Sequence, residues 1–242
     1  MLDQLEIIEL NEQLHNADPK EILNQLVELI PNTAISFSGA EDVLLIEFTQ
    51  NQTNPPPIFT LDTGRLHPET SSFIEEVKKH YNRSIEALLP NQTQVNKLIN
   101  NKGLYSFYED GHEECCNIRK VEPLRKKLKH LNAWITGQRR DQSPARAEVA
   151  VIEIDQNFSS ADHQVIKINP LANWSSAKVW QNIRLFKVPY NRLHDKGFVS
   201  IGCEPCTKAI RPGQHEREGR WWWEEATIKE CGLHRDNIVD DS

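Results

Sequence analysis

Thr33-Ala34-Ile35-Ser36-Phe37-Ser38-Gly39-Ala40-Glu41-Asp42 is the stretch that decides the fold. The run 33–37 is short and mostly apolar, which predicts a buried strand, and a helix is expected from Val43 onward. A small-residue turn joins them, so backbone N–H groups and a helix N-terminus would surround a bound anion. The turn lacks the Gly-Lys-Ser/Thr ending of a Walker loop, and by itself it would be an ordinary tight turn. A second strand, 58–61, ends in Asp62-Thr63-Gly64, so together the two turns predict a nucleotide site.

The same alternation of short strands and amphipathic helices continues along the chain. Two helices are expected within residues 2–30, with Asp18-Pro19 opening the second. Further strands are predicted at 84–89, 133–136 and near 148–154 and 165–168, and helices at 68–81, 92–101, 121–131 and 175–186. This order predicts an α/β fold, a doubly wound, mostly parallel sheet with helices on both faces. Such sheets bind ligands beyond the carboxyl ends of their strands, where the turns at Ser38 and Asp62 and the Arg139 loop are expected.

Composition and charge exclude several classes of protein. The chain has 242 residues, 38% hydrophobic and 26% charged, with a net charge of −7 and a mean hydropathy of −0.60. These values are typical of a soluble globular protein with one large or two small domains. No apolar run is long enough for a membrane span, and the acidic N-terminus lacks the features of a secretory signal, so we expect a cytoplasmic protein. The acidic balance argues against nucleic-acid binding but allows a local basic site for a small anion.

Five cysteines form two tight pairs and one single residue. The pairs are Cys115-Cys116 and Cys203-Glu204-Pro205-Cys206, and Cys231 stands alone. In a reducing compartment this pattern predicts a four-thiolate metal site and a separate reactive thiol rather than disulfides. Zinc and an iron–sulfur cluster both fit four thiolates, but adjacent cysteines are awkward around one zinc ion, which favours the cluster. Chance burial as small hydrophobes is disfavoured because the neighbouring residues are polar.

Two further stretches carry candidate binding chemistry. Arg139, Arg140 and Arg146 offer bidentate donors for phosphate or sulfate, although an isolated basic run is usually a solvated loop. Residues 211–224 combine basic side chains with three consecutive tryptophans, of which at least one should pack on a ligand, a guanidinium or another chain. Cys231 precedes Gly232 and lies near His234, as expected for an activated thiolate, the alternative being an incidental surface cysteine.

Taken together, these motifs resemble the assimilatory sulfonucleotide reductases, which reduce adenosine 5′-phosphosulfate (APS) or its 3′-phosphorylated relative (PAPS). The resemblance runs from about Thr33 to His234 and includes the terminal Glu230-Cys231-Gly232-Leu233-His234. The paired cysteines are similar to those of the branch that carries a [4Fe–4S] cluster. The resemblance implies an adenine nucleotide alpha hydrolase-like fold with a nucleotide-binding domain, 1–210, and a mobile C-terminal catalytic segment, 211–242.

The resemblance also implies a role for individual residues. Cys231 would be the catalytic nucleophile, and Lys120 would lie between cluster and substrate. The cluster ligands would be Cys115, Cys116, Cys203 and Cys206. The other substrate-binding residues would be Ser38, Gly39, Asp42, Leu61, Gly64, Arg140, Arg146, Arg217, Arg220 and His234. Glu41 and Asp42 close to the nucleotide would disfavour an additional phosphate, so we expect a preference for APS.

The implied reaction is the reduction of APS to sulfite and AMP through an S-sulfocysteine on Cys231, in sulfate assimilation and cysteine biosynthesis. The chain ends soon after His234 without a fused thioredoxin-like domain, so a separate thioredoxin or glutaredoxin is expected as reductant. Association into a homo-oligomer stays open at this point. Three alternatives also stay open: a cluster-bearing PAPS reductase, an adenylating enzyme of the ATP-pyrophosphatase type, and a zinc-stabilised binding module without catalysis.

Overall fold

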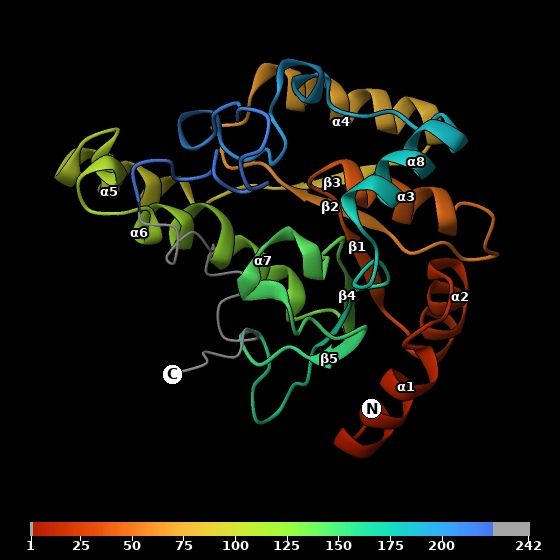
Figure 1. Cartoon of the computed structure of the whole chain (residues 1–242). Coiled ribbons are helices and arrows are strands. Elements are labelled where there is room, and N and C mark those ends of the chain that lie inside the picture. Colours follow the sequence, from red (N-terminus) through yellow and green to blue (C-terminus); the bar gives the residue numbers. More distant parts are fainter. Residues whose placement is uncertain (1, 225–242) are drawn as a thin grey trace.

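The computed structural model describes residues 2–224, which form one six-stranded sheet with helices packed on both faces (Figure 1). The strands are β1 (Thr33–Ser36), β2 (Ile58–Leu61), β3 (Ile85–Leu88), β4 (Ala133–Ile135), β5 (Ile152–Ile154) and β6 (Ile166–Ile168). The helices are α1 (Gln4–Leu14), α2 (Pro19–Leu29), α3 (Ala40–Thr49), α4 (Pro68–Tyr81), α5 (Gln92–Lys102), α6 (Glu113–Cys116), α7 (Glu122–Leu128) and α8 (Ser176–Phe186). In this part of the chain, no helix combines the length and the apolarity needed to cross a membrane.

The strand order is β3-β2-β1-β4-β6-β5, and every neighbouring pair is parallel except β5 with β6. The prediction of a doubly wound, mostly parallel sheet is therefore confirmed. The chain adds β2 and β3 on one side of β1 and then returns to add β4 on the other side. The order of the strands thus reverses between β1 and β4, and the loops after these two strands flank the crevice in which such sheets bind ligands.

Alternation along the strands divides the core between the two faces, because successive side chains of a strand point to opposite sides. Ile35 and the other strand side chains on the same face of the sheet pack in a large apolar cluster with α1, α2, α3, α4 and α8. Ala34, Phe59 and Trp134 face a smaller cluster built with α7, whose Leu124 and Leu128 are completely buried. The central strands are apolar on both faces, as expected for parallel strands covered by helices on each side.

Two helix starts differ from the expectation. α3 begins at Ala40, so Glu41 and Asp42 lie in its first turn rather than in a loop before it. The helix expected over 121–131 begins earlier, because α6 leads through a π-helical turn, Asn117–Val121, directly into α7. In this turn the Glu122 N–H donates to the Asn117 carbonyl, five residues back. The wider turn accommodates Pro123, which lacks an N–H. The pair Cys115-Cys116 lies at the end of α6.

Candidate active site

A cavity of about 210 Å³ opens at the carboxyl ends of β1, β2 and β4, at the reversal of strand order. Most of the predicted substrate residues line it. They are Ser38, Gly39, Asp42, Leu61, Lys120, Arg146, Arg217 and Arg220. Two predicted residues do not: Gly64 lies against Arg119, and the Arg140 guanidinium bonds to the Val149 carbonyl and to Asn173. Cys231 and His234 lie outside the described residues.

Asp42 ties the loop after β1 to the loop after β4. Its Oδ2 accepts hydrogen bonds from Ser38 N at 2.6 Å, Ser38 Oγ at 2.9 Å and Gly39 N at 2.8 Å. Its Oδ1 accepts from Gly137 N, in the other loop, at 2.9 Å. The carboxylate oxygens are thus occupied by the loops themselves, so Asp42 positions the cavity wall.

Burial and the negative charge of Glu41 raise the pKa of Asp42 to about 6, although the hydrogen bonds from Ser38 and Gly39 oppose the change. The Asp42 carboxyl acts only as an acceptor in these bonds, so its ionised form, which has no proton to donate, fits the surrounding donors best. At neutral pH Asp42 therefore carries its charge and holds both loops.

Arg139 forms a buried ion cluster beside Asp42. Its side chain is 1% exposed, and its Nη2 lies 2.9 Å from Glu41 Oε1 and 3.0 Å from Glu216 Oε1. Burial alone would raise the pKa of Glu41, but the charge of Arg139 and its hydrogen bonds outweigh this effect and lower that pKa. Burial and the charge of Glu41 raise the pKa of Glu216 to about 7, against the opposing charge of Arg139. The cluster joins α3, the loop after β4 and the segment that follows residue 210.

The cations of the cavity come from separate parts of the chain. Lys120 lies in the π-helical turn, Arg146 in the loop after β4, and Arg217 and Arg220 in the C-terminal segment. Gly202 makes room for one of them, because a Cβ there would lie 2.4 Å from Arg220 Nη2. These positive charges, gathered in one partly buried space, suit a ligand with several negatively charged oxygens.

The two cysteine pairs meet in a second, smaller cavity next to the first. Cys115, Cys116, Cys203 and Cys206 all line it, together with Arg65, Arg119 and Lys120. Lys120 and Cys203 also line the larger cavity, so the two spaces adjoin. The two cysteine pairs thus lie around one space, and Lys120 lines both cavities.

The surroundings of the four cysteines fit a negatively charged thiolate-bound group. Burial raises the pKa of Cys115, opposed by the charges of Arg65 and Arg119, and burial raises that of Cys206 to about 12. Buried thiolates without a metal would be costly, whereas metal binding displaces their protons. Within residues 2–224, no three His, Cys, Asp or Glu side chains are arranged to hold a single metal ion.

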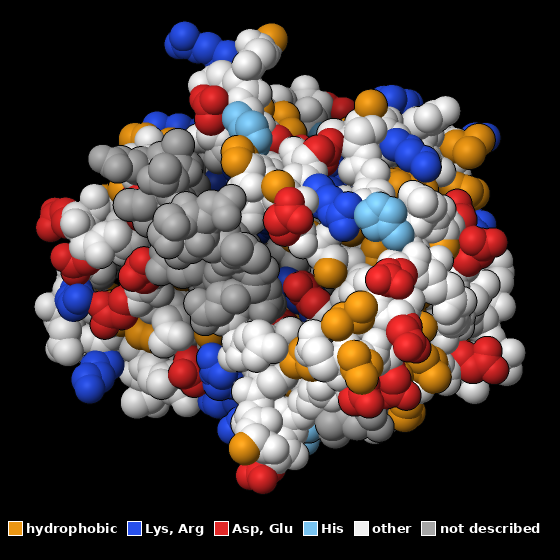
Figure 2. Space-filling model, turned by 60° about the horizontal axis from the view of Figure 1, so that its bottom comes forward, with side chains coloured by type: hydrophobic (Ala, Val, Ile, Leu, Met, Phe, Trp, Pro, Cys, Tyr) orange, Lys and Arg blue, Asp and Glu red, His pale blue; other side chains and the backbone are white. Residues whose placement is uncertain are grey.

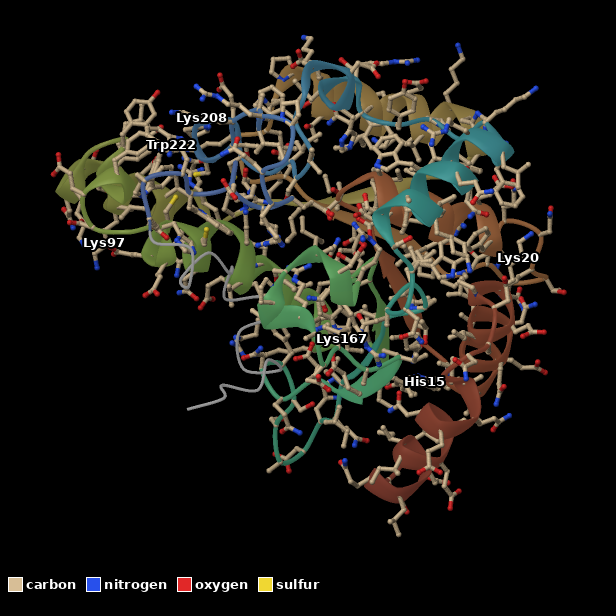
Figure 3. The ribbon with its side chains drawn as sticks, viewed as in Figure 1. His15, Lys20, Lys97, Lys167, Lys208 and Trp222 are labelled. Carbon is tan, nitrogen blue, oxygen red and sulfur yellow. The ribbon has the colours of Figure 1, made fainter. Side chains whose placement is uncertain are left out.

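The segment after residue 210 covers the cysteines with its tryptophans. Trp221 is fully buried, stacked on His112 at 4.1 Å, with the Arg220 guanidinium 4.5 Å from its ring. This confirms the prediction that one tryptophan packs on a guanidinium. Trp222 is half-exposed beneath Lys208, whose Nζ lies 2.9 Å from the ring centre (Figure 3).

Several cavity residues were missed by sequence reasoning. Arg139, which belongs to the same basic loop as Arg140, is buried against Glu41 and Glu216 and does not itself line the cavity. Glu216 lies in the tryptophan-containing stretch without a motif of its own. Gln138 and His194 line the cavity from the loop after β4 and from a 3-10 turn, Arg192–Lys196. The sequence around Gln138 and His194 contains no motif that marks them as site residues, because only the fold brings these two side chains to the crevice.

Comparison with known proteins adds independent findings. Residues 32–209 match the family model described as the phosphoadenosine phosphosulfate reductase domain. The chain is 53% identical over 228 residues to the adenosine 5′-phosphosulfate reductase of Pseudomonas aeruginosa (strain LESB58), covering 93% of this chain and 85% of that protein. It is 54% identical over 239 residues to the chloroplastic 5′-adenylylsulfate reductase 1 of Arabidopsis thaliana. Of that relative, it spans about half the length, 51%.

Solved structures support the same fold. The phosphoadenylyl-sulfate (PAPS) reductase of Candida auris, in a phosphate complex, aligns with a TM-score of 0.72 at 29% identity, covering 87% of this chain and 98% of that one. Yeast FAD synthetase in complex with FAD aligns with a TM-score of 0.55 at 15% identity, over 86% of this chain and 70% of that one, which shows a common fold alone. The expected adenine nucleotide alpha hydrolase-like fold is thereby confirmed.

Proposed function

Because the chain belongs to the phosphoadenosine phosphosulfate reductase family, we propose that it reduces APS to sulfite and AMP. One observation carries the proposal. The cavity at the reversal of strand order gathers four cations, Lys120, Arg146, Arg217 and Arg220, and adjoins the space lined by four cysteines. The names of the relatives at 53% and 54% identity support APS as the substrate.

The cations have a defined task in this reaction. The sulfur of a phosphosulfate is an electrophile shielded by oxygens that carry negative charge. Lys120 and the arginines would offset this charge as the substrate binds and would stabilise the phosphate oxygen that leaves with AMP. Ser38, Gly39 and Leu61 would line the nucleotide part of the site.

Cys231 would supply the nucleophile. Its thiolate attacks the sulfur of APS, so an S–S bond forms while the S–O bond breaks, and the electron pair of that bond leaves with AMP. One thiolate of a thioredoxin or glutaredoxin then attacks the Cys231 sulfur and releases sulfite with its electron pair. The second thiol of the partner resolves the mixed disulfide, so the partner is oxidised by two electrons and Cys231 is regenerated.

Cys115, Cys116, Cys203 and Cys206 would hold a [4Fe–4S] cluster. Four cysteines around one space, two of them adjacent in sequence, support a multi-iron cluster over a single zinc ion. When bound, the cluster would act through charge and structure rather than as an electron carrier, because the thiols already supply both electrons. A redox change of the cluster during turnover, seen by electron paramagnetic resonance, would contradict this role.

The proposal divides the chain into a nucleotide-binding domain, 1–210, and a catalytic segment, 211–242. Contacts such as the 2.6 Å pair of His112 Nδ1 with Glu224 Oε2 attach the described part of that segment to α6. A cytoplasmic location stays a prediction. On the face drawn in Figure 2 the described acidic and basic side chains are interspersed.

The test is turnover under anaerobic conditions. With APS and no reductant, wild-type protein should release one equivalent of AMP and become heavier by one sulfite group. Reduced thioredoxin should then discharge it as sulfite. Cys231→Ser should lose both events, because a hydroxyl is far less ionised and less nucleophilic at neutral pH. Normal turnover by Cys231→Ser would overturn the assignment of the nucleophile.

Reduction of PAPS is the second candidate, supported by the fold of the Candida auris enzyme. The carboxylates of Glu41 and Asp42 on the cavity wall favour APS, because they would repel an added phosphate dianion. We expect a higher kcat/KM with APS than with PAPS in parallel assays. An equal or higher value with PAPS would establish the second candidate instead.

A further inference from the structure

Gln138 is a buried amide in the cavity wall that the proposed reaction does not use. The residue follows Gly137 in the loop after β4. It lines the cavity and is 4% exposed. Neither its Nε2 nor its Oε1 has a hydrogen-bond partner among residues 2–224. The nearby Gln142 differs, because its Nε2 donates to Glu41 Oε1 at 3.1 Å and its Oε1 accepts from Arg139 N at 3.1 Å.

An unpaired buried amide is unfavourable, because both its donor and its acceptor have lost water without a replacement. Such groups are uncommon in folded proteins and point to a missing partner. Gln138 lies in the wall of an open cavity, so a bound molecule is the partner that the geometry allows.

The chemistry of the amide restricts which part of a ligand it contacts. An amide is neutral and offers donors and an acceptor together, which matches a group that both donates and accepts, such as a ribose hydroxyl or the edge of adenine. The anionic end of a phosphosulfate is already matched by Lys120 and the arginines. We infer that Gln138 is a specificity-determining residue that hydrogen-bonds the neutral nucleoside end of the substrate.

A second neutral group in the same wall supports this inference. His194 lines the cavity, and its buried Nε2 also has no partner within residues 2–224. Burial lowers its pKa, against the opposing charge of Glu41, so the imidazole is neutral at neutral pH. The cavity thus has neutral polar groups in addition to its cations, as a nucleoside attached to a charged group requires.

The first test compares two variants of the full-length, anaerobically purified protein. Gln138→Met keeps the length of the side chain and removes the amide, and Gln142→Met does the same to the partnered glutamine. Without nucleotide, Gln138→Met should melt no lower than wild type, because no intramolecular bond is lost, while its AMP affinity should fall about tenfold, or about 1.4 kcal/mol. Gln142→Met should melt lower than wild type. Unchanged AMP affinity in Gln138→Met would overturn the inference.

The second test identifies the contacted group and separates contact from indirect effects. Binding of AMP, 2′-deoxy-AMP, 3′-deoxy-AMP and purine riboside 5′-monophosphate is measured for wild type and Gln138→Met. If Gln138 contacts a group, deleting that group should cost wild type affinity but cost the variant little, and the analogue that behaves so names the ribose or the base. If, for all three analogues, the affinity loss from the Gln138→Met substitution simply adds to the loss from deleting the ligand group, direct contact is overturned, even if the variant also melts lower.

The inference rests on the proposed function, and the two fail differently. If wild-type protein does not bind AMP or APS, the proposed function fails. If wild type binds AMP and Gln138→Met binds it equally well, the function stands and only the inference about Gln138 is overturned.

Discussion

Arg139 is almost fully buried, and its charge is balanced inside the protein rather than by solvent. Glu41 and Glu216 supply the opposite charges at 2.9 and 3.0 Å. Such a pair contributes little net stability when intact, but removing one partner leaves an uncompensated buried charge. Glu216 is the neighbour of Arg217, so the ion cluster also sets where one of the cavity's cations lies.

The raised pKa of Glu216 predicts a pH dependence of stability. The folded protein holds this proton up to about pH 7, whereas the unfolded chain releases it near the ordinary glutamate pKa of 4.5. The contribution of Glu216 to stability is therefore complete below the unfolded pKa and is lost as the pH rises through the folded pKa. Between pH 4.5 and 8, the free energy of unfolding should fall less in Glu216→Gln than in wild type, as measured by urea denaturation. Parallel pH curves would contradict the raised pKa.

At the scale of elements, α3 and the loop after β4 approach so closely that only glycine fits at position 137. A Cβ there would lie 2.5 Å from Asp42 Oδ1 and 2.7 Å from Glu41 Cβ. Asp42 cannot yield easily, because hydrogen bonds from Ser38, Gly39 and Gly137 hold its carboxylate. The junction of these two elements therefore forms the rigid wall of the nucleotide cavity.

We expect Gly137→Ala to lower the free energy of unfolding by roughly 1–3 kcal/mol, as overpacking does elsewhere, and to weaken AMP binding. Gly39→Ala is the matched control for stability, because a Cβ there would meet only Glu41 Oε2 at an ordinary 3.5 Å. Denaturant titration of both variants checks the expectation. Equal stabilities of the two variants would show that the loops move apart freely.

At the scale of the whole molecule, three distant parts of the chain enclose the cysteines. α6 carries Cys115 and Cys116, a short 3-10 turn carries Cys206, and Trp221 closes the space from the C-terminal side. The proposed cluster would join these parts, so its binding free energy would also be folding free energy.

Loss of a ligand should therefore affect metal content and stability together. Cys206→Ser should bind less iron and sulfide and melt lower than wild type, whereas Cys231→Ser should keep the brown colour and the melting temperature. Iron, zinc and sulfide analysis with thermal unfolding checks both variants. Stoichiometric zinc without iron, or bleaching of Cys231→Ser instead of Cys206→Ser, would contradict the assignment of the cysteines.

Local patterns in the sequence determined the type and order of the elements. Asp18-Pro19 begins α2 with Asp18 as its cap, and α4 spans residues 68–81 as predicted, because capping and apolar periodicity act within a few residues. The two cysteine pairs likewise indicated that they lie close together in the fold, because in a reducing compartment such pairs favour a shared metal site over disulfides. The sequence did not indicate the π-helical turn before Pro123, because proline is common in the first turn of a helix and therefore predicts a helix start near residue 121.

Only the tertiary structure decided which side chains share the crevice. Arg139 rather than Arg140 faces inward, although the two are adjacent and chemically identical, because Glu41 and Glu216 converge on Arg139 from distant segments. The fold likewise buries the Gln138 amide in the cavity wall without a hydrogen-bond partner among the described residues. Short-range propensity depends on neighbours in sequence, whereas burial, charge pairing and unmet hydrogen bonds depend on neighbours in space.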